Sequence, residues 1–240
     1  MRITINGQLS LTMLYEMICE GIPEAIPIMQ NTDGLETIIP KDKVDKYKEI
    51  CAEWEKITML ELEHDTYTKI VLGDVNNYIA VTADGKSKCK GRFEFKDLAL
   101  HKNKSFLIIP IALHEFFVNG VEPIDTIKAN KNIFDFCGGV KIKGDWNFWE
   151  HVIKDGDYSV NEIQHTIRYY MSNGGSKIVK KNNTDNREIQ IEAGKWMQSI
   201  FINYEEKEFS EYDINYDYYI QKVKKEIEGL MPNRNQLSLF

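Results

Sequence analysis

The sequence has few cysteines and no long apolar run. Its four cysteines, at positions 19, 51, 89 and 137, form no C-x-x-C pair, which argues against a disulfide scaffold and a cysteine zinc site. No apolar stretch approaches the roughly 18 residues that cross a bilayer. Residues 1–11 also lack the pattern of a cleavable signal peptide. We therefore expect a cytoplasmic protein with no membrane partner.

Several cofactor motifs are also missing. The five histidines show no H-E-x-x-H or H-x-H spacing, so a zinc hydrolase is not indicated. The glycines form neither a G-x-G-x-x-G element nor a P-loop, so neither a dinucleotide-binding fold nor a P-loop fold is indicated.

The composition predicts a folded chain with an uneven charge. Of its 240 residues, 42% are apolar and 11% aromatic, which is enough for a core. A net charge of −7 argues against a wholly basic nucleic-acid binder. Residues 75–145 nevertheless hold 11 bases against 8 acids. We call seven of these bases the basic island: Lys86, Lys88, Lys90, Arg92, Lys96, Lys102 and Lys104.

Residues 1–95 alternate between helical and strand patterns. Apolar spacing predicts a helix over residues 11–18, ended by Gly21 and Pro23. A polar, glycine-containing segment between two apolar runs predicts a β-hairpin over residues 26–39. The residues between the hairpin and position 95 predict a helix capped by Asp42, three strands at residues 59–65, 67–72 and 78–81, and a turn at Asp84-Gly85.

From residue 96 the pattern indicates a second, mostly helical unit. We predict helices over residues 108–118 and 148–152 and a final amphipathic helix over residues 213–230. Residues 160–171 fit either a helix or a strand, and residues 189–202 are ambiguous. The predicted class is therefore α+β, with antiparallel strands and helices in residues 1–95, a mostly helical unit in residues 96–230 and a tail in residues 231–240.

Asp33 lies in the turn of the predicted hairpin. A carboxylate held between two strands is a suitable ligand for a hard cation such as Mg²⁺. The simpler interpretation is that Asp-Gly is a favourable turn sequence without a metal role. The residues alone leave both interpretations open.

The segment N-T-D-G-L at residues 31–35 resembles motif C of the family B DNA polymerases, usually D-T-D-S. The resemblance implies that Asp33 is the catalytic aspartate that binds Mg²⁺. Asn31 replaces the first aspartate and brings no charge, so it has a supporting role in the motif, together with Thr32 and Gly34.

Other segments resemble the same family in the same order. They are E-x-E-x-x-x-Y-x-K at residues 61–69, Asn-Asn-Tyr at residues 76–78, K-x-K-G at residues 88–91 and D-I-N-Y-D-Y-Y-I at residues 213–220. Two asparagines precede Tyr78 where the family often has lysines. The resemblance implies the C-terminal part of a palm in residues 1–95 and a thumb in residues 96–230, of a bacteriophage type.

Motifs A and B of the family do not occur in the chain. Two-metal phosphoryl transfer needs at least two converging carboxylates, so we expect a nucleotidyltransferase that requires an N-terminal polymerase chain. Its substrates would be primer-template DNA and a deoxynucleoside triphosphate, in the cytoplasm of a host bacterium. The expected DNA contacts are Tyr78, Lys86, Lys88, Lys90, Gly91 and Arg92.

The last five residues, Q-L-S-L-F, resemble the peptide with which bacterial polymerases bind the sliding clamp. The resemblance implies that Gln236, Leu237, Leu239 and Phe240 bind a host clamp. Burial of a large apolar side chain in a partner contributes roughly 1.5–3 kcal/mol. The alternative is that Leu239 and Phe240 pack on their own domain.

Two other functions fit the residues. The chain could be a non-enzymatic DNA- and clamp-binding accessory protein derived from a polymerase palm. It could also be a small metal-dependent nuclease that uses Asp33 with Glu36 or Glu63.

The sequence also has an aromatic cluster, formed by Trp146, Phe148 and Trp149, that fits a core better than a base-stacking surface.

Overall fold

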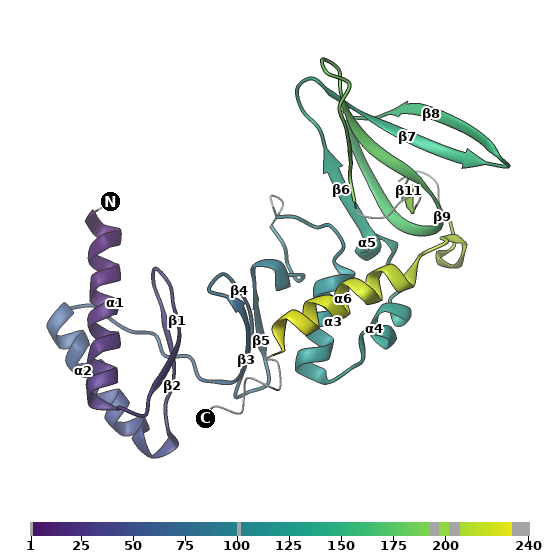
Figure 1. Cartoon of the computed structure of the whole chain (residues 1–240). Coiled ribbons are helices and arrows are strands. Elements are labelled where there is room, and N and C mark those ends of the chain that lie inside the picture. Colours follow the sequence, from purple (N-terminus) through teal and green to yellow (C-terminus); the bar gives the residue numbers. More distant parts are fainter. Residues whose placement is uncertain (1, 100–101, 193–196, 202–206, 232–240) are drawn as a thin grey trace. The chain divides into compact units, whose positions relative to one another are not determined.

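A computed structural model describes residues 2–99, 102–192, 197–201 and 207–231 (Figure 1). It divides into two compact units, Met1–Lys88 and Cys89–Phe240. Helices and strands mix along the chain, which confirms the α+β class. The division lies a few residues before the predicted boundary at residue 95. The assignment of the two units to palm and thumb stays a prediction.

Two helices form the first core of unit 1. They are α1 (Arg2–Gly21) and α2 (Val44–Thr58), the latter preceded by a 3-10 turn, η1 (Lys41–Lys43). Their buried side chains meet at Leu14, Ile18 and Trp54, and the Trp54 indole N–H donates to the Ser10 carbonyl at 2.7 Å. The predicted helix and its end at Gly21 are confirmed.

The predicted cap of α2 is wrong. Lys43 precedes the helix and no side chain caps it, while Asp42 lies within the 3-10 turn and pairs with Lys43 at 3.6 Å. The extra turn displaces the carboxylate from the position where it could accept from the first free N–H groups of α2.

The strands of unit 1 form two small antiparallel sheets. The predicted hairpin is confirmed as β1 (Ile26–Gln30) and β2 (Leu35–Ile38). Strands β3 (Tyr67–Asp74), β4 (Asn77–Thr82) and β5 (Ser87–Lys90) follow in order, and the first two confirm the predictions there. Gly85 makes the predicted turn with φ of 80°.

The strand predicted over residues 59–65 is wrong, because this segment has no strand partner. The Glu55 carboxylate accepts from the Leu62 N–H at 2.7 Å and so ties the segment back to the end of α2. Alternating polarity alone did not make a strand here, since a strand also needs backbone hydrogen bonds to a neighbouring strand.

Unit 2 begins with short helices. They are η2 (Gly91–Phe93), α3 (Ile108–His114), its π-helical continuation η3 (Glu115–Asn119), α4 (Pro123–Ala129) and α5 (Ile133–Phe136). A last 3-10 turn, η4 (Phe209–Glu211), precedes α6 (Tyr216–Leu230). The helices predicted over residues 108–118 and 213–230 are confirmed. Helix α6 begins where the Asn215 side chain accepts from the Tyr218 N–H at 2.9 Å.

The middle of unit 2 is an antiparallel sheet, so the prediction of a mostly helical unit is wrong. Its strands are β6 (Cys137–Lys141), β7 (Trp146–Lys154), β8 (Asp157–Ile163), β9 (Thr166–Asn182), β10 (Glu188–Gln190) and β11 (Gln198–Ile200). Residues 148–152 belong to β7 rather than to a helix. A short run of aromatic and β-branched residues fits either structure, and cross-strand pairing with β8 and β9 decides it.

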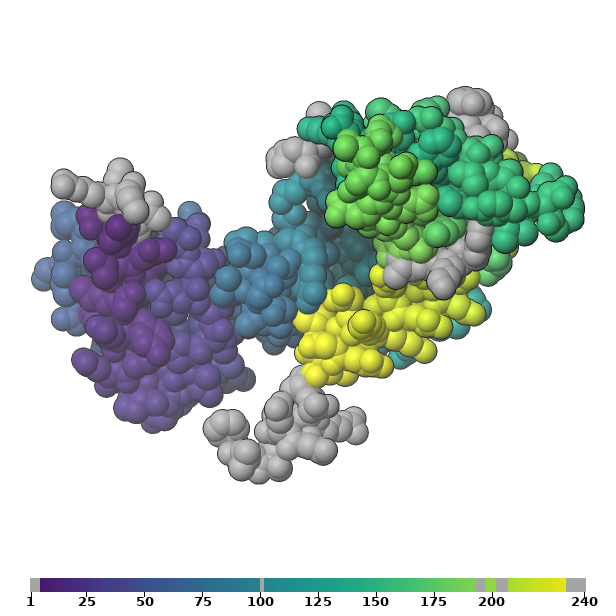
Figure 2. Space-filling view, turned by 45° about the horizontal axis from the view of Figure 1, so that its top comes forward, coloured from purple at the N-terminus to yellow at the C-terminus, as the bar shows by residue number. Residues whose placement is uncertain are grey.

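The long strand β9 takes part in two halves of this sheet. Its residues 166–171 lie between β6 and β11, and its residues 177–182 lie between β7 and β10. Gly175 lies between these halves, where an added Cβ would approach the Met197 carbonyl carbon to 2.5 Å. Only glycine permits this close approach of two backbones. Figure 2 shows a face of unit 2 on which the green strands and the yellow α6 both lie at the surface.

Tyr219 joins α6 to this sheet. Its hydroxyl donates to the Phe136 carbonyl at 2.6 Å and accepts from the Met171 N–H at 2.9 Å. The side chain is fully buried, and burial raises the pKa of its phenol well above the usual value. The neutral hydroxyl therefore links α6 to the last residue of α5 and to β9.

We expect Tyr219→Phe to destabilise unit 2 by about 1–3 kcal/mol for each backbone group left unpaired. Tyr216→Phe is the matched control, because Tyr216 packs on the Phe136 ring and no hydrogen bond of its hydroxyl is found among the described residues. Urea unfolding followed by circular dichroism gives both free energies. Equal stability of the two variants would contradict the bridging role.

Candidate functional site

The β1–β2 turn places Asp33 at the surface. The Asn31 N–H donates to the Gly34 carbonyl at 3.0 Å, and the Asn31 side-chain oxygen accepts from the Asp33 N–H at 3.0 Å. Asn31 therefore fixes the backbone of the turn rather than offering a free oxygen beside Asp33. Thr32 is exposed, and an added Cβ at Gly34 would meet the Asn31 oxygen at 3.4 Å.

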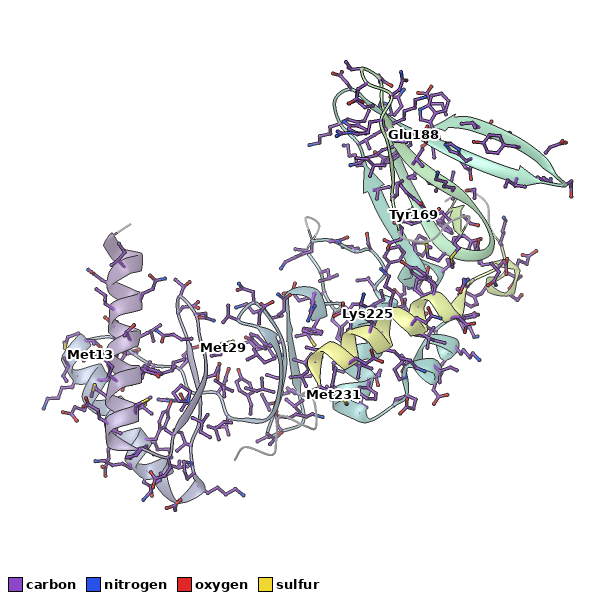
Figure 3. All side chains as sticks on the ribbon, viewed as in Figure 1. Met13, Met29, Tyr169, Glu188, Lys225 and Met231 are labelled. Carbon is purple, nitrogen blue, oxygen red and sulfur yellow. The ribbon has the colours of Figure 1, made fainter. Side chains whose placement is uncertain are left out.

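The hairpin below this turn is held on both faces. Leu35 packs against the core of α1 and α2, and the Gln30 side chain donates to the Thr12 hydroxyl at 3.4 Å. On the other face, Met29 packs against Tyr78 and Ala80 of β4, and Figure 3 shows Met29 pointing from the hairpin toward that sheet. The Asp33 carboxylate is thus mounted on an anchored turn.

Asp33 is not joined by other acids into a metal cage. Among the described residues, no group of three or more His, Cys, Asp or Glu side chains could hold an ion. One exposed carboxylate is a suitable oxygen ligand for Mg²⁺, but it does not complete the two-carboxylate site that two-metal chemistry needs. The donor set found in the described part of the chain is therefore incomplete.

A second polar cluster forms beside the hairpin. Glu36 on β2 is half-buried, and burial raises the pKa of its carboxyl, while the nearby Lys88 ammonium lowers it and Asp65 raises it further. Lys88 pairs with Asp65 at 3.8 Å, and the Tyr67 hydroxyl donates to Asp65 at 2.9 Å. The sequence motifs include Glu36, Lys88 and the Tyr67 of the element at residues 61–69, but not Asp65. Glu63 is exposed in the irregular segment before β3.

The raised pKa of Glu36 predicts a pH dependence of stability. Because the folded state holds this proton more tightly, the stabilisation is complete below the unfolded pKa of about 4.3 and is lost as pH rises through the higher folded value. Glu36→Gln removes this titration, so its melting temperature should gain on the wild type as pH rises through that window. Melting curves between about pH 3 and pH 7, with exposed Glu24→Gln as control, test the sign.

Most of the basic island is paired with acids in its own unit. In unit 1, Lys86 contacts Asp84 at 2.7 Å and Lys88 contacts Asp65. In unit 2, Arg92 contacts Glu226 at 3.0 Å. Lys102 contacts Glu94 at 2.8 Å. These ion pairs reduce the charge available to phosphate, and DNA binding by the island stays a prediction.

The other residues that we expected to contact DNA also have defined places in the fold. Tyr78 is only 6% exposed and lies in the core with Met29. Lys90 ends β5 and is half-buried, and Gly91 starts η2 with φ of 65°. Their expected contacts with DNA stay predictions. The expected clamp-binding residues Gln236, Leu237, Leu239 and Phe240 lie outside the described residues.

The segment at residues 213–220 anchors the sheet. Asp213 accepts from the Gly174 N–H at 2.9 Å and from the Asn173 side chain at 2.8 Å, so it holds the middle of β9. Tyr219 and the capping Asn215 belong to the same segment. The segment that resembles the polymerase family thus contains residues that position α6 on the sheet.

No protein-family model matches the sequence, and comparison with curated proteins finds no significant similarity. The resemblance to family B polymerases therefore rests on the short motifs alone. None of the helices in the described ranges combines the length and the hydropathy needed to span a bilayer.

Proposed function

We propose that the chain is the C-terminal part or subunit of a split family B DNA polymerase. The observation that carries the proposal is the anchored hairpin, which presents Asp33 at its turn within a segment similar to motif C. In this proposal Asp33 binds Mg²⁺, which would supply positive charge to the transferring phosphoryl group. A partner chain contributes the second carboxylate and the grip on the triphosphate.

Two features of unit 1 support a partner chain. In the described ranges, β1 and β2 pair only with each other, so each strand has an outer edge without a neighbouring strand. Helix α1 exposes Leu9 by 62% and Ile5 by 47%. Open strand edges and exposed apolar side chains are typical of surfaces that bind another polypeptide.

Primer extension tests the proposal. The chain is mixed with the product of a neighbouring gene that carries an aspartate-bearing D-x-x-S-L-Y-P strand and a K-x-x-x-N-x-x-Y-G helix. We expect extension by the mixture with Mg²⁺ and none by either chain alone. Failure of a stable complex of the two chains to extend a primer would refute the enzymatic assignment.

The alternative is a non-enzymatic accessory protein that binds DNA and the sliding clamp. The incomplete donor set around Asp33 favours it. Under this alternative, Asp33→Asn leaves replication of the phage intact, whereas deletion of residues 236–240 abolishes the function. In the enzymatic proposal, both changes impair replication.

A further inference from the structure

Three cations of unit 2 lie against indole rings. The Lys180 ammonium is 5.2 Å and the Arg187 guanidinium carbon 5.3 Å from the centre of the Trp146 ring. The Lys181 ammonium is 5.8 Å from the centre of the Trp149 ring. Side chains alternate between the two faces of a strand, so Trp149 and Lys181 lie on the opposite face of β7 and β9 from Trp146 and Lys180. We call Trp146, Lys180 and Arg187 the cation–indole cluster. Such contacts are favourable but leave the positive charge unneutralised.

The cluster lies at one end of the sheet, where β7 meets β9 and the β9–β10 turn. Phe148 pairs with Lys180, which places Lys180 diagonally beside Trp146 on the same face. The Asn183 N–H donates to the Asp145 carbonyl at 2.8 Å and joins the β9–β10 turn to the β6–β7 loop. The label of Glu188 in Figure 3 marks this end of unit 2.

The turn itself holds Arg187 in a defined place. The Asn182 side-chain oxygen accepts from the N–H groups of Thr184 and Asp185, at 2.8 and 3.1 Å. The Asp185 carboxylate accepts from the Arg187 N–H at 3.0 Å. The guanidinium is therefore carried by an ordered turn and is exposed.

The cluster differs from the basic island in its partners. Lys86, Lys88, Arg92 and Lys102 each form an ion pair. In the part of the chain that the structure describes, no carboxylate pairs with the side chain of Lys180, Lys181 or Arg187. Glu188 follows Arg187 directly in the sequence, but its carboxylate lies 4.0 Å from the imidazole of the buried His151. Lys180 and Arg187 thus lie against the half-buried Trp146 ring rather than against a carboxylate.

We propose that the cation–indole cluster binds single-stranded nucleic acid. Phosphates would take the Lys180 and Arg187 side chains as counterions, and an unpaired base would stack on the Trp146 indole once the cations shift toward phosphate. Duplex DNA offers the phosphates but not the base faces, so single strands are the preferred ligand. This site is separate from the hairpin of Asp33 and does not rest on the proposed polymerase activity.

The test uses the full chain and a fluorescein-labelled oligo(dT) of about 15 nucleotides, which exceeds most single-domain site sizes. The double variant K180Q/R187Q should weaken binding at least ~10-fold and reduce the log–log salt slope by about 1.4, since each single-strand contact contributes about 0.7. K128Q/K225Q, which changes two exposed lysines of unit 2, is the matched control and should bind as the wild type does.

Several results would overturn the site. They are absence of oligo(dT) binding by the wild-type chain at low salt, an unchanged salt slope in the double variant, or an equal loss in the control variant. Equal affinity for a duplex or for inorganic polyphosphate would overturn the stacking of bases. Melting curves of all variants, followed by circular dichroism, show that a loss of binding is not a loss of folding.

Discussion

Alanine at position 33 is expected to abolish primer extension by the two-chain complex. The change removes the carboxylate at the hairpin turn while the Asn31–Gly34 hydrogen bond that forms the turn stays possible. A metal ion contributes several kcal/mol of charge stabilisation to the transition state, so the rate should fall on the order of 10³-fold or more. Single-turnover extension of a labelled primer at saturating nucleotide measures this rate.

Asp42→Ala is the matched control for this experiment, because Asp42 is an exposed acid of the same unit that pairs with its neighbour Lys43 at 3.6 Å. It should extend primers at the wild-type rate. Asp33→Asn keeps the size of the side chain and loses its charge, and it should be as inactive as the alanine variant. A complex that remains active with Asp33→Ala would remove the catalytic assignment.

Loss of the last five residues is expected to abolish binding to the sliding clamp. If Leu239 and Phe240 each bury about 1.5–3 kcal/mol in the clamp, losing both costs about 3–6 kcal/mol. This corresponds to a rise in Kd of roughly 10² to 10⁴. Surface plasmon resonance with immobilised clamp compares the full chain with the chain lacking residues 236–240.

The double variant L239A/F240A should reproduce the deletion, and N233A/N235A in the preceding tether should bind normally. The alternative, in which the tail packs on its own domain, predicts an effect on stability instead of on clamp binding. In that case the deletion lowers the melting temperature of the chain and leaves its affinity for the clamp unaltered.

Local signals were sufficient for the elements that position Asp33. Gly21 and Pro23 mark the end of α1, and the polar turn between two apolar runs marks the hairpin. These features depend on neighbours within a few residues, so the sequence indicates them directly. The cap at Asp42 failed because one extra turn of 3-10 helix precedes α2, and such a shift has no strong sequence signal.

Contacts between residues that are far apart in the sequence could not be predicted from local patterns. The run around Phe148 became a strand because β8 and β9 flank it, and periodicity alone cannot reveal those partners. Likewise, the sequence indicated Arg92 only as an expected DNA contact, whereas the fold brings Glu226, more than 130 residues further along the chain, to 3.0 Å from its guanidinium. The burial of Glu36 has the same origin, since it depends on elements distant in the sequence.

The shared strand β9 has a consequence for how unit 2 comes apart. Residues 166–171 and 177–182 of β9 form the central strand of the two halves of the sheet. Neither half can therefore open fully without exposing the backbone amides of the other. Local opening should therefore be confined to the ends, such as the outermost strand β8. Amide exchange in the middle of β9 should follow global unfolding, and heat should melt the sheet in one cooperative transition.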